Sequence, residues 1–247
     1  MIKEQEIAKM IDHSLLHPTM TDHDLEIGCE IADKYQVASV CVKPYAVRLA
    51  GELLKDSQVV TGTVVGFPHG NSAIEIKLAE TLHACAEGAV EIDMVINIGK
   101  ALQEDWDYLE REIGGITSAA HEQQAIVKVI FENDFLREDQ WKIELCKICT
   151  SVGADFVKTS TGYGFVKGPD NTYSYQGATH QDLLLMRKHS GEHVQVKAAG
   201  GVRTLDDLLE VRALGVTRVG ATATVAIMEA AKTRFSEGSS LDSPWMT

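Results

Sequence analysis

The chain has few basic residues and no long apolar run. Lysine and arginine together number 23 against 36 aspartates and glutamates, which gives a formal net charge of −13 over 247 residues. A surface this acidic argues against nucleic acid or an anionic membrane as a partner. No apolar stretch approaches the roughly 18–20 residues of a membrane span, and the opening MIKEQEIAKMIDHS contains no signal-peptide core. We therefore expect a cytoplasmic protein with neither a nucleic-acid nor a membrane partner.

Cysteine is also scarce. Its residues are odd in number and scattered: Cys29, Cys41, Cys85, Cys146 and Cys149. This usage is typical of reduced thiols in the cytosol and does not favour a disulfide framework. Cys146 and Cys149 have CxxC spacing, but they lie in a helical-looking stretch without a second pair, which is a weak metal signal. HxH and HExxH spacings are absent as well, so we predict no metal site.

What the sequence has is a regular alternation of short apolar runs and longer helical ones. Strands are expected over 11–16, 39–43, 59–67, 89–97, 125–131, 154–160, 194–200 and 217–222. Helical segments lie between them, and Ser72 and Thr204 are the expected N-caps of two. Eight strands and seven or eight helices predict a single-domain α/β fold, a (β/α)8 TIM barrel over 1–235, with a flexible tail over 236–247. A doubly wound open sheet is the alternative.

One interval breaks this rhythm. Roughly sixteen residues around 163–177 separate the sixth expected strand from the next helix, whereas such loops usually have about 2–6 residues. The interval contains Lys167 and the tyrosines Tyr163, Tyr173 and Tyr175. We expect it to form a mobile flap over the pocket, with a plain surface elaboration as the alternative.

Polar side chains interrupt the expected strands, and barrel enzymes place catalysis at the carboxyl ends of strands. The candidates are Asp12, Cys41, Asp93, Lys128, Glu132, Lys158 and Lys197. Burying three lysines and several carboxylates without a function would be costly, although Cys41 alone also fits plain core packing. Desolvation and a second ammonium lower the pKa of a lysine from about 10.4, which makes its amine nucleophilic. With a carboxylate to move protons, the set predicts imine chemistry on a carbonyl substrate. Alternation along a strand also predicts that Lys128 and Glu132 share one face.

A phosphate site is the second expected feature. Gly200 and Gly201 follow the seventh strand, and Gly220 and Thr222 are expected at the turn after the eighth. Loops after these two strands bind phosphate in this fold through backbone N–H groups and helix N-termini. Gly162 is expected to add a third edge, and Arg203 to assist.

At these residues the chain resembles the deoxyribose-phosphate aldolases, a family of class I aldolases. The resemblance covers nearly the whole chain, and its most specific pieces are KTSTG at 158–162 and KAAGGVR at 197–203. It implies cleavage of 2-deoxy-D-ribose 5-phosphate to acetaldehyde and D-glyceraldehyde 3-phosphate without a cofactor, by a homo-oligomer such as a dimer or tetramer.

The resemblance also implies a role for each matching residue. Lys158 matches the imine-forming lysine, Lys197 the lysine that perturbs it, and Asp93 the aspartate that relays protons. Asp12 and Lys128 match supporting positions, and Cys41 matches a cysteine that lines the pocket. The phosphate-loop positions are matched by Gly162, Gly200, Gly201 and Gly220.

Three departures from the family pattern are notable: the first concerns a tyrosine thought to assist proton transfer, and the other two concern the phosphate end of the site and therefore the substrate. The family's C-terminal tyrosine is absent from the ending SPWMT, Tyr163 stands where some members have a lysine, and Thr222-Ala223 replaces a serine pair. We expect Lys167 to replace the missing lysine near the phosphate. Two alternatives remain: an imine-forming aldolase for another or unphosphorylated acceptor, and a non-catalytic barrel that binds a sugar phosphate.

Overall fold

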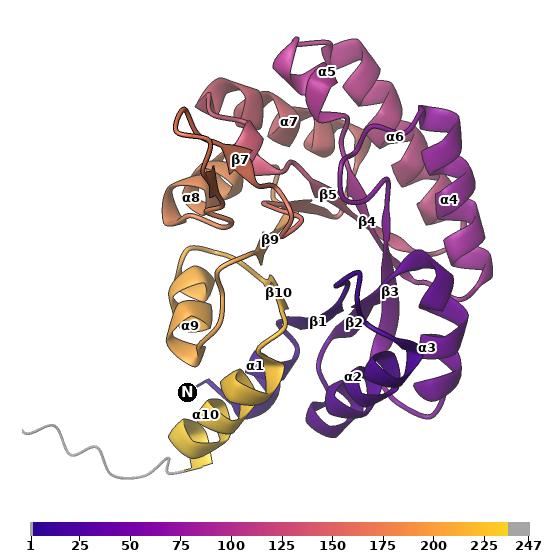
Figure 1. Cartoon of the computed structure of the whole chain (residues 1–247), viewed down its shortest axis with the longest axis vertical. Helices are drawn as coiled ribbons and strands as arrows, with labels where there is room; N and C mark the ends of the chain where they lie inside the picture. Colours follow the sequence, from indigo (N-terminus) through magenta and orange to yellow (C-terminus); the bar gives the residue numbers. More distant parts are fainter. Residues whose placement is uncertain (1, 237–247) are drawn as a thin grey trace, which may run out of the picture.

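The computed structural model describes residues 2–236, which form a closed barrel of parallel strands surrounded by helices (Figure 1). Around the barrel the strands follow the order β1-β10-β9-β6-β5-β4-β3-β2, so the barrel strands neighbour each other in chain order. They are β1 (Ile11–Leu15), β2 (Ser39–Val42), β3 (Val60–Val65), β4 (Glu91–Val95), β5 (Ile126–Ile130), β6 (Phe156–Lys158), β9 (Gln195–Ala199) and β10 (Arg218–Ala221). Closure between β1 and β10 confirms the (β/α)8 barrel and excludes the open sheet.

Most strands are shorter than the apolar runs that predicted them. The chain leaves β3 at Gly66, which has a φ of 64°. Asn97 was expected in the fourth strand, but it caps a helix instead, its side chain accepting a hydrogen bond from the N–H of Lys100. The residues just past each strand therefore belong to the loops at the carboxyl end of the barrel.

The helices lie on the outside of the ring of strands. They are α1 (Glu4–Ala8), α2 (Asp22–Tyr35), α3 (Val47–Leu53), α4 (Ile74–Ala86), α5 (Ile98–Leu102), α6 (Trp106–Glu122), α7 (Asp139–Val152), α8 (His180–His189), α9 (Leu205–Ala213) and α10 (Thr224–Ser236). Short 3₁₀ helices cover Pro44–Ala46 and Asn133–Phe135.

The two expected helix caps have different outcomes. Thr204 caps α9 as predicted and closes a capping box with Asp207. The prediction for Ser72 is wrong, because Ala73 has an extended backbone and α4 begins only at Ile74. Ala73 is the residue at the cap position, and its side chain offers no oxygen to the helix.

The interval after β6 folds into a small antiparallel hairpin. Its strands are β7 (Val166–Lys167) and β8 (Tyr173–Ser174), with Lys167 opposite Tyr173. The Asp134 carboxylate fixes the end of the hairpin by accepting hydrogen bonds from the backbone N–H groups of Gln176 at 2.6 Å and Gly177 at 3.0 Å. The segment thus has regular structure and an anchor, and its mobility stays a prediction.

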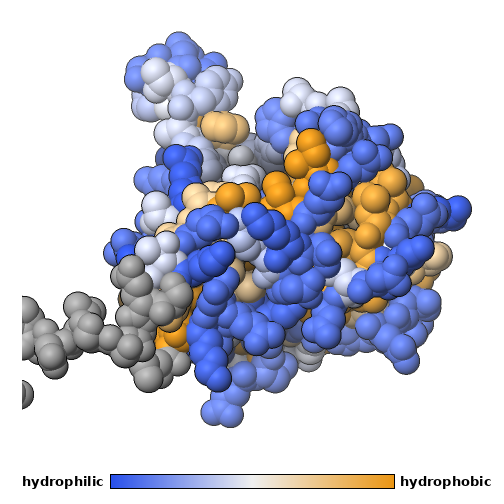
Figure 2. All heavy atoms as spheres, turned by 90° about the horizontal axis from the view of Figure 1, so that it is seen from below, coloured by the Kyte–Doolittle hydropathy of each residue, from blue (hydrophilic) through white to orange (hydrophobic). Residues whose placement is uncertain are grey.

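The face seen from below is mostly hydrophilic, with apolar residues in strips between charged ones (Figure 2). None of the helices in the described range is long and apolar enough to cross a membrane. The tail expected over 236–247 lies outside the described residues, except for Ser236 at the end of α10.

Candidate active site

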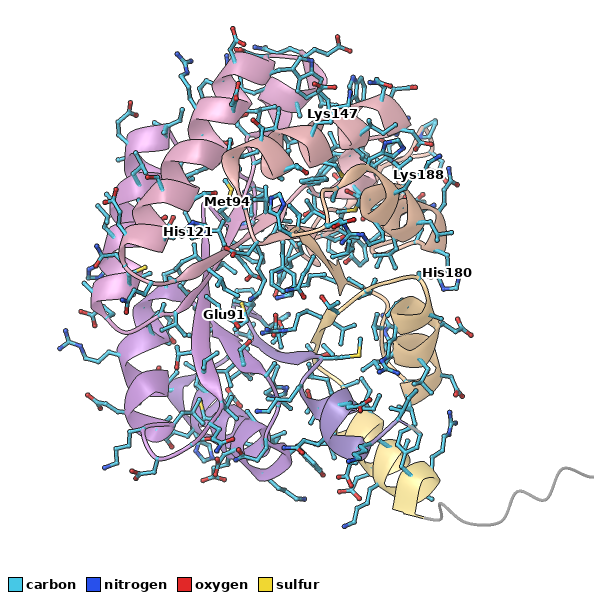
Figure 3. The ribbon with its side chains drawn as sticks, turned by 180° about the vertical axis from the view of Figure 1, so that it is seen from behind. Glu91, Met94, His121, Lys147, His180 and Lys188 are labelled. Atoms are coloured by element: carbon cyan, nitrogen blue, oxygen red, sulfur yellow. The ribbon has the colours of Figure 1, made fainter. Side chains whose placement is uncertain are left out.

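The interior of this barrel is charged at positions where barrels usually pack branched apolar side chains. Within residues 2–236, one continuous set of ion pairs joins Asp12, Glu91, Asp93, Lys128, Lys158, Lys197 and Arg218. We call these residues the barrel charge network. Figure 3 places Glu91 inside the ring of strands, whereas Lys188 and His180 lie at the periphery. The network is buried except for part of Arg218, whose side chain is 13% exposed.

Asp93 lies at the centre of the network. Its Oδ2 accepts hydrogen bonds from Lys158 Nζ and Lys197 Nζ, each at 2.7 Å, and its Oδ1 accepts one from Lys128 Nζ at 3.0 Å. The strand register explains this meeting, because Lys158 is aligned with Lys197, and Asp93 with Lys128. Burial alone would raise the pKa of Asp93, but the three lysines outweigh it and hold that pKa well below its usual range.

The three lysines differ in how many carboxylates they contact. Lys128 contacts the three carboxylates of the network, at 2.5–3.3 Å. Lys197 contacts Asp12 at 2.5 Å and Asp93 at 2.7 Å. Lys158 contacts Asp93 alone. Since each buried ammonium needs a compensating charge, Lys158 is the least stabilised of the three as a cation.

The charge balance of the network also indicates that Lys158 is the least stabilised cation. Within the described residues the network holds four basic and three acidic side chains, so full ionisation would leave one buried positive charge without a partner. Burial lowers the pKa of Lys158, Asp93 opposes this effect, and the Lys197 ammonium lowers the pKa further. Asp12 and Asp93 outweigh burial at Lys197 and raise its pKa. The network therefore favours a neutral amine on Lys158 and an ammonium on Lys197.

A cavity of about 480 Å³ opens above Lys158 and Lys197. Its lining contains most of the residues expected from the sequence: Asp12, Cys41, Lys158, Gly162, Lys197, Gly200, Gly201, Arg203, Gly220 and Thr222. Asp93 and Lys128 do not line it, and Asp93 connects to it through the amines of the two lining lysines. Burial raises the pKa of the Cys41 thiol to about 11, so this cysteine is a neutral lining group.

Two of the phosphate-loop expectations change in detail. Gly220 lies within β10 and not in the turn after it. A Cβ at this position would be 3.6 Å from Lys197 Cε, so the glycine leaves open the space beside that lysine. Lys167 is exposed on the hairpin and does not line the cavity, whereas Arg203 does.

Glu132 was expected to share a face with Lys128, and this prediction is wrong. Strand β5 ends at Ile130, and Glu132 has a left-handed backbone with a φ of 52°. Its carboxylate instead accepts hydrogen bonds from the backbone N–H of Thr161, at 3.3 Å, and from the hydroxyl of the same residue. Burial raises the pKa of Glu132 to about 7. This carboxyl group thereby holds the turn that follows Lys158.

Sequence reasoning missed several residues of the site. Arg218 and Glu91 complete the charge network, and Tyr175 and His17 line the cavity. Period-two alternation was an available signal for the first two, because Glu91 precedes Asp93 by two residues, and Arg218 precedes Gly220 by two. Tyr175 was named only as one residue of the expected flap, and its place in the cavity was not predicted, since it depends on the fold of the hairpin.

The histidines and cysteines do not gather around a common point. Between residues 2 and 236, no group of three or more His, Cys, Asp or Glu side chains is arranged to hold a metal ion. Cys146 and Cys149 are buried in α7, and burial raises the pKa of both thiols.

Comparison with known proteins gives one consistent result. The family model described as DeoC/LacD family aldolase matches residues 6–223. Deoxyribose-phosphate aldolase of Rhodopirellula baltica is 49% identical over 227 residues, which are 92% of this chain and 90% of that protein. The enzyme of the same name from Caldicellulosiruptor saccharolyticus is 47% identical over 91% of this chain and 98% of its own. The tetrameric deoxyribose phosphate aldolase structure from Aeropyrum pernix superposes with a TM-score of 0.82 at 27% identity, covering 94% of this chain and 93% of that one.

Proposed function

The chain belongs to the DeoC/LacD family of aldolases, and from this premise we propose that it cleaves 2-deoxy-D-ribose 5-phosphate reversibly. The products are acetaldehyde and D-glyceraldehyde 3-phosphate, and the intermediate is an imine on Lys158. The observation that carries the proposal is the charge balance of the barrel interior, which leaves Lys158 as the one lysine of the network with a single carboxylate contact among the described residues. The family and the curated relatives at 47–49% identity support the reaction class.

Imine formation uses the neutral amine of Lys158. Its nitrogen attacks C1 of the open-chain sugar. The carbinolamine then takes up a proton through a cavity water and loses water to give an iminium ion. Lys197 stays an ammonium because Asp12 and Asp93 both stabilise it. Its charge lowers the pKa of the adjacent Lys158 amine and so favours the neutral form that attacks.

Carbon–carbon cleavage then follows with balanced proton movement. The C3 hydroxyl gives its proton through a cavity water to Asp93, the C2–C3 bond breaks, and its electron pair moves into the iminium to form an enamine. Glyceraldehyde 3-phosphate leaves, C2 of the enamine takes a proton back along the same path, and hydrolysis releases acetaldehyde and Lys158. Asp93 is positioned for this relay, since its Oδ2 contacts the amines of both lysines that line the cavity, at 2.7 Å. No step requires a metal or an organic cofactor.

The phosphate of the substrate would lie at the glycine-lined end of the cavity. Gly162, Gly200 and Gly201 have positive φ angles of 83–92°, and Arg203 adds a cation to the same lining. The capped N-terminus of α9 begins just beyond, and helix N-termini favour anions.

Assembly and location belong to the same proposal. We propose a dimer or tetramer, supported by the tetrameric relative, to be checked by light scattering coupled to size-exclusion chromatography. A cytoplasmic location is supported by the five cysteines, which are all free thiols.

The direct test is turnover of deoxyribose 5-phosphate, with acetaldehyde and glyceraldehyde 3-phosphate both quantified. We expect equal amounts of the two products and the same rate with and without EDTA. Product only from an unphosphorylated or longer sugar would favour the related aldolase. Binding of the sugar phosphate without turnover would favour the non-catalytic barrel, and a loss with EDTA that zinc restores would contradict the metal-free mechanism.

A further inference from the structure

Tyr175 brings a hydroxyl from the hairpin into the cavity. It lies one residue after β8 and lines the cavity together with Lys158 and Arg203. Its hydroxyl oxygen is fully buried, yet it has no hydrogen-bond partner among residues 2–236. The Ser160 hydroxyl is close enough to affect the pKa of this phenol, but its oxygen is likewise buried without a partner. A buried hydroxyl without a partner costs free energy unless a ligand satisfies it.

The hydroxyl lies between two of the glycine turns. A Cβ on Gly200 would be 1.8 Å from the Tyr175 oxygen, and a Cβ on Gly162 would be 4.0 Å from it. The phenol can approach the backbone this closely only because Gly200 has no Cβ, whereas 4.0 Å at Gly162 is an ordinary contact distance. It therefore lies beside the part of the cavity lining that contains Gly162, Gly200 and Arg203.

The surrounding contacts hold the ring in place. The next two residues donate their N–H groups to Asp134, and Ala178 donates its own to the carbonyl of Gly200 at 3.1 Å. The Phe165 ring packs against the Tyr175 ring with centroids 5.6 Å apart. A side chain held in advance loses little conformational freedom when a ligand binds to it.

We propose that the Tyr175 hydroxyl donates a hydrogen bond to the phosphate group of the substrate, so that the hairpin supplies part of the specificity for a phosphorylated sugar. This inference rests on the proposed function. It assigns to Tyr175 the role expected of Lys167, whose side chain lies outside the cavity.

The protonation state of the phenol agrees with a donor role. Burial raises the pKa of Tyr175, and the nearby carboxylates of Glu132 and Asp134 raise it further. The hydroxyl therefore keeps its proton at neutral pH and presents it to an anion.

The experiment compares Tyr175→Phe with the parent on deoxyribose 5-phosphate and on deoxyribose. A hydrogen bond to a charged group corresponds to about a ten- to hundred-fold change in an equilibrium constant. We expect kcat/KM for the phosphorylated sugar to fall by about this factor, mainly through KM, and the value for deoxyribose to stay within about two-fold. Tyr173→Phe is the matched control, because this tyrosine is 64% exposed on the same hairpin and does not line the cavity.

Exchange of the acetaldehyde methyl protons with deuterated water gives a second readout, because it needs the imine and enamine but no phosphate. We expect the same exchange rate in Tyr175→Phe and in the parent. Slower exchange would make Tyr175 a proton donor to the enamine, and equal losses on both sugars would make it a packing residue, so either result overturns the proposal. An unchanged phosphate preference also overturns it. Absence of exchange in the parent would instead contradict the proposed function itself.

Discussion

At the residue scale, the chemistry depends on unequal stabilisation of three similar lysines. Lys128 contacts three carboxylates, Lys197 two and Lys158 one, and the directions of their pKa shifts follow this order. Desolvation acts on all three, so the number of carboxylate partners decides in which direction each pKa is shifted. We therefore propose Lys158 as the nucleophile, both because it lacks further carboxylate contacts and because an ammonium lies beside it.

Replacing Asp93 with asparagine separates proton transfer from imine formation. General acid–base groups contribute about 10²–10⁴-fold to rate, so we expect turnover to fall within that range. Because Asp93 raises the pKa of Lys158, its loss lowers that pKa, and reductive trapping of acetaldehyde should persist to lower pH than in the parent. Circular dichroism serves as the folding control. Turnover close to that of the parent would exclude Asp93 from the relay.

Glu132 makes stability depend on pH near neutrality. Its pKa is about 7 in the folded chain and about 4.3 in an unfolded one. Between these values the folded chain keeps a proton that the unfolded chain has lost, so stability falls as pH rises through this window. Urea unfolding at pH 5 and at pH 8 should show that the unfolding free energy of the parent falls more between these two pH values than that of Glu132→Gln. The glutamine cannot titrate in this range. Equal losses in the two proteins would show that Glu132 ionises normally.

At the scale of elements, buried side chains tie the loops to the barrel rim. Lys77 of α4 donates hydrogen bonds to the carbonyls of Gly70 and Val95 and to the Glu112 carboxylate of α6, at 2.6–2.7 Å. Glu112 in turn accepts the N–H of Asn97 at 2.8 Å. The loops after β3 and β4 are thereby fixed to each other and to two outer helices.

Removing only one partner of the Lys77–Glu112 ion pair should strongly destabilise the protein. Lys77→Met leaves a buried carboxylate without its ion-pair partner, and we expect a loss of about 3–5 kcal/mol in unfolding free energy. The double variant Lys77→Met with Glu112→Leu should lose less, because no buried charge is left unpaired. Lys147→Met is the surface control: it removes a 57% exposed partner of Glu144 and should cost less than about 1 kcal/mol. If urea unfolding shows the same loss of unfolding free energy for Lys77→Met and Lys147→Met, the buried pair has no structural role.

Prediction from sequence succeeds for residues that stand out within one element and fails for residues whose place depends on several elements. Lys158, Lys197 and Asp93 are recognisable because charged residues interrupt apolar runs, and Thr204 because an oxygen precedes a helical pattern. Arg218 and Glu91 lie at strand beginnings, where charges are ordinary, so only their spacing of two residues from Gly220 and Asp93 indicated that they face inward. Tyr175 reaches the cavity through a hairpin, so its position depends on contacts made far from it in sequence, above all the one with Gly200.

At the scale of the whole molecule, the barrel combines a charged interior with an apolar outer layer, and the proposed reaction requires one neutral amine in that interior. Its outer layer is an ordinary apolar core between strands and helices, which is why the alternation of apolar runs was enough to predict the architecture. The interior is different, because its charged residues neutralise each other across strands. The partners are far apart in the sequence, so no single segment reveals a pair. The fold therefore depends on the outward-facing apolar residues of the strands, whereas the proposed reactivity depends on the inward-facing charged residues of the same strands.

The most direct test of this account is to locate the covalent intermediate. The protein is incubated with acetaldehyde, reduced with borohydride, digested and analysed by mass spectrometry. We predict an ethyl group on Lys158 and no labelling of the same peptide in Lys158→Leu, which should also have no turnover. An ethyl group on Lys197 or Lys128 in the parent would contradict the account, because it would place the neutral amine on a lysine with two or more carboxylate partners.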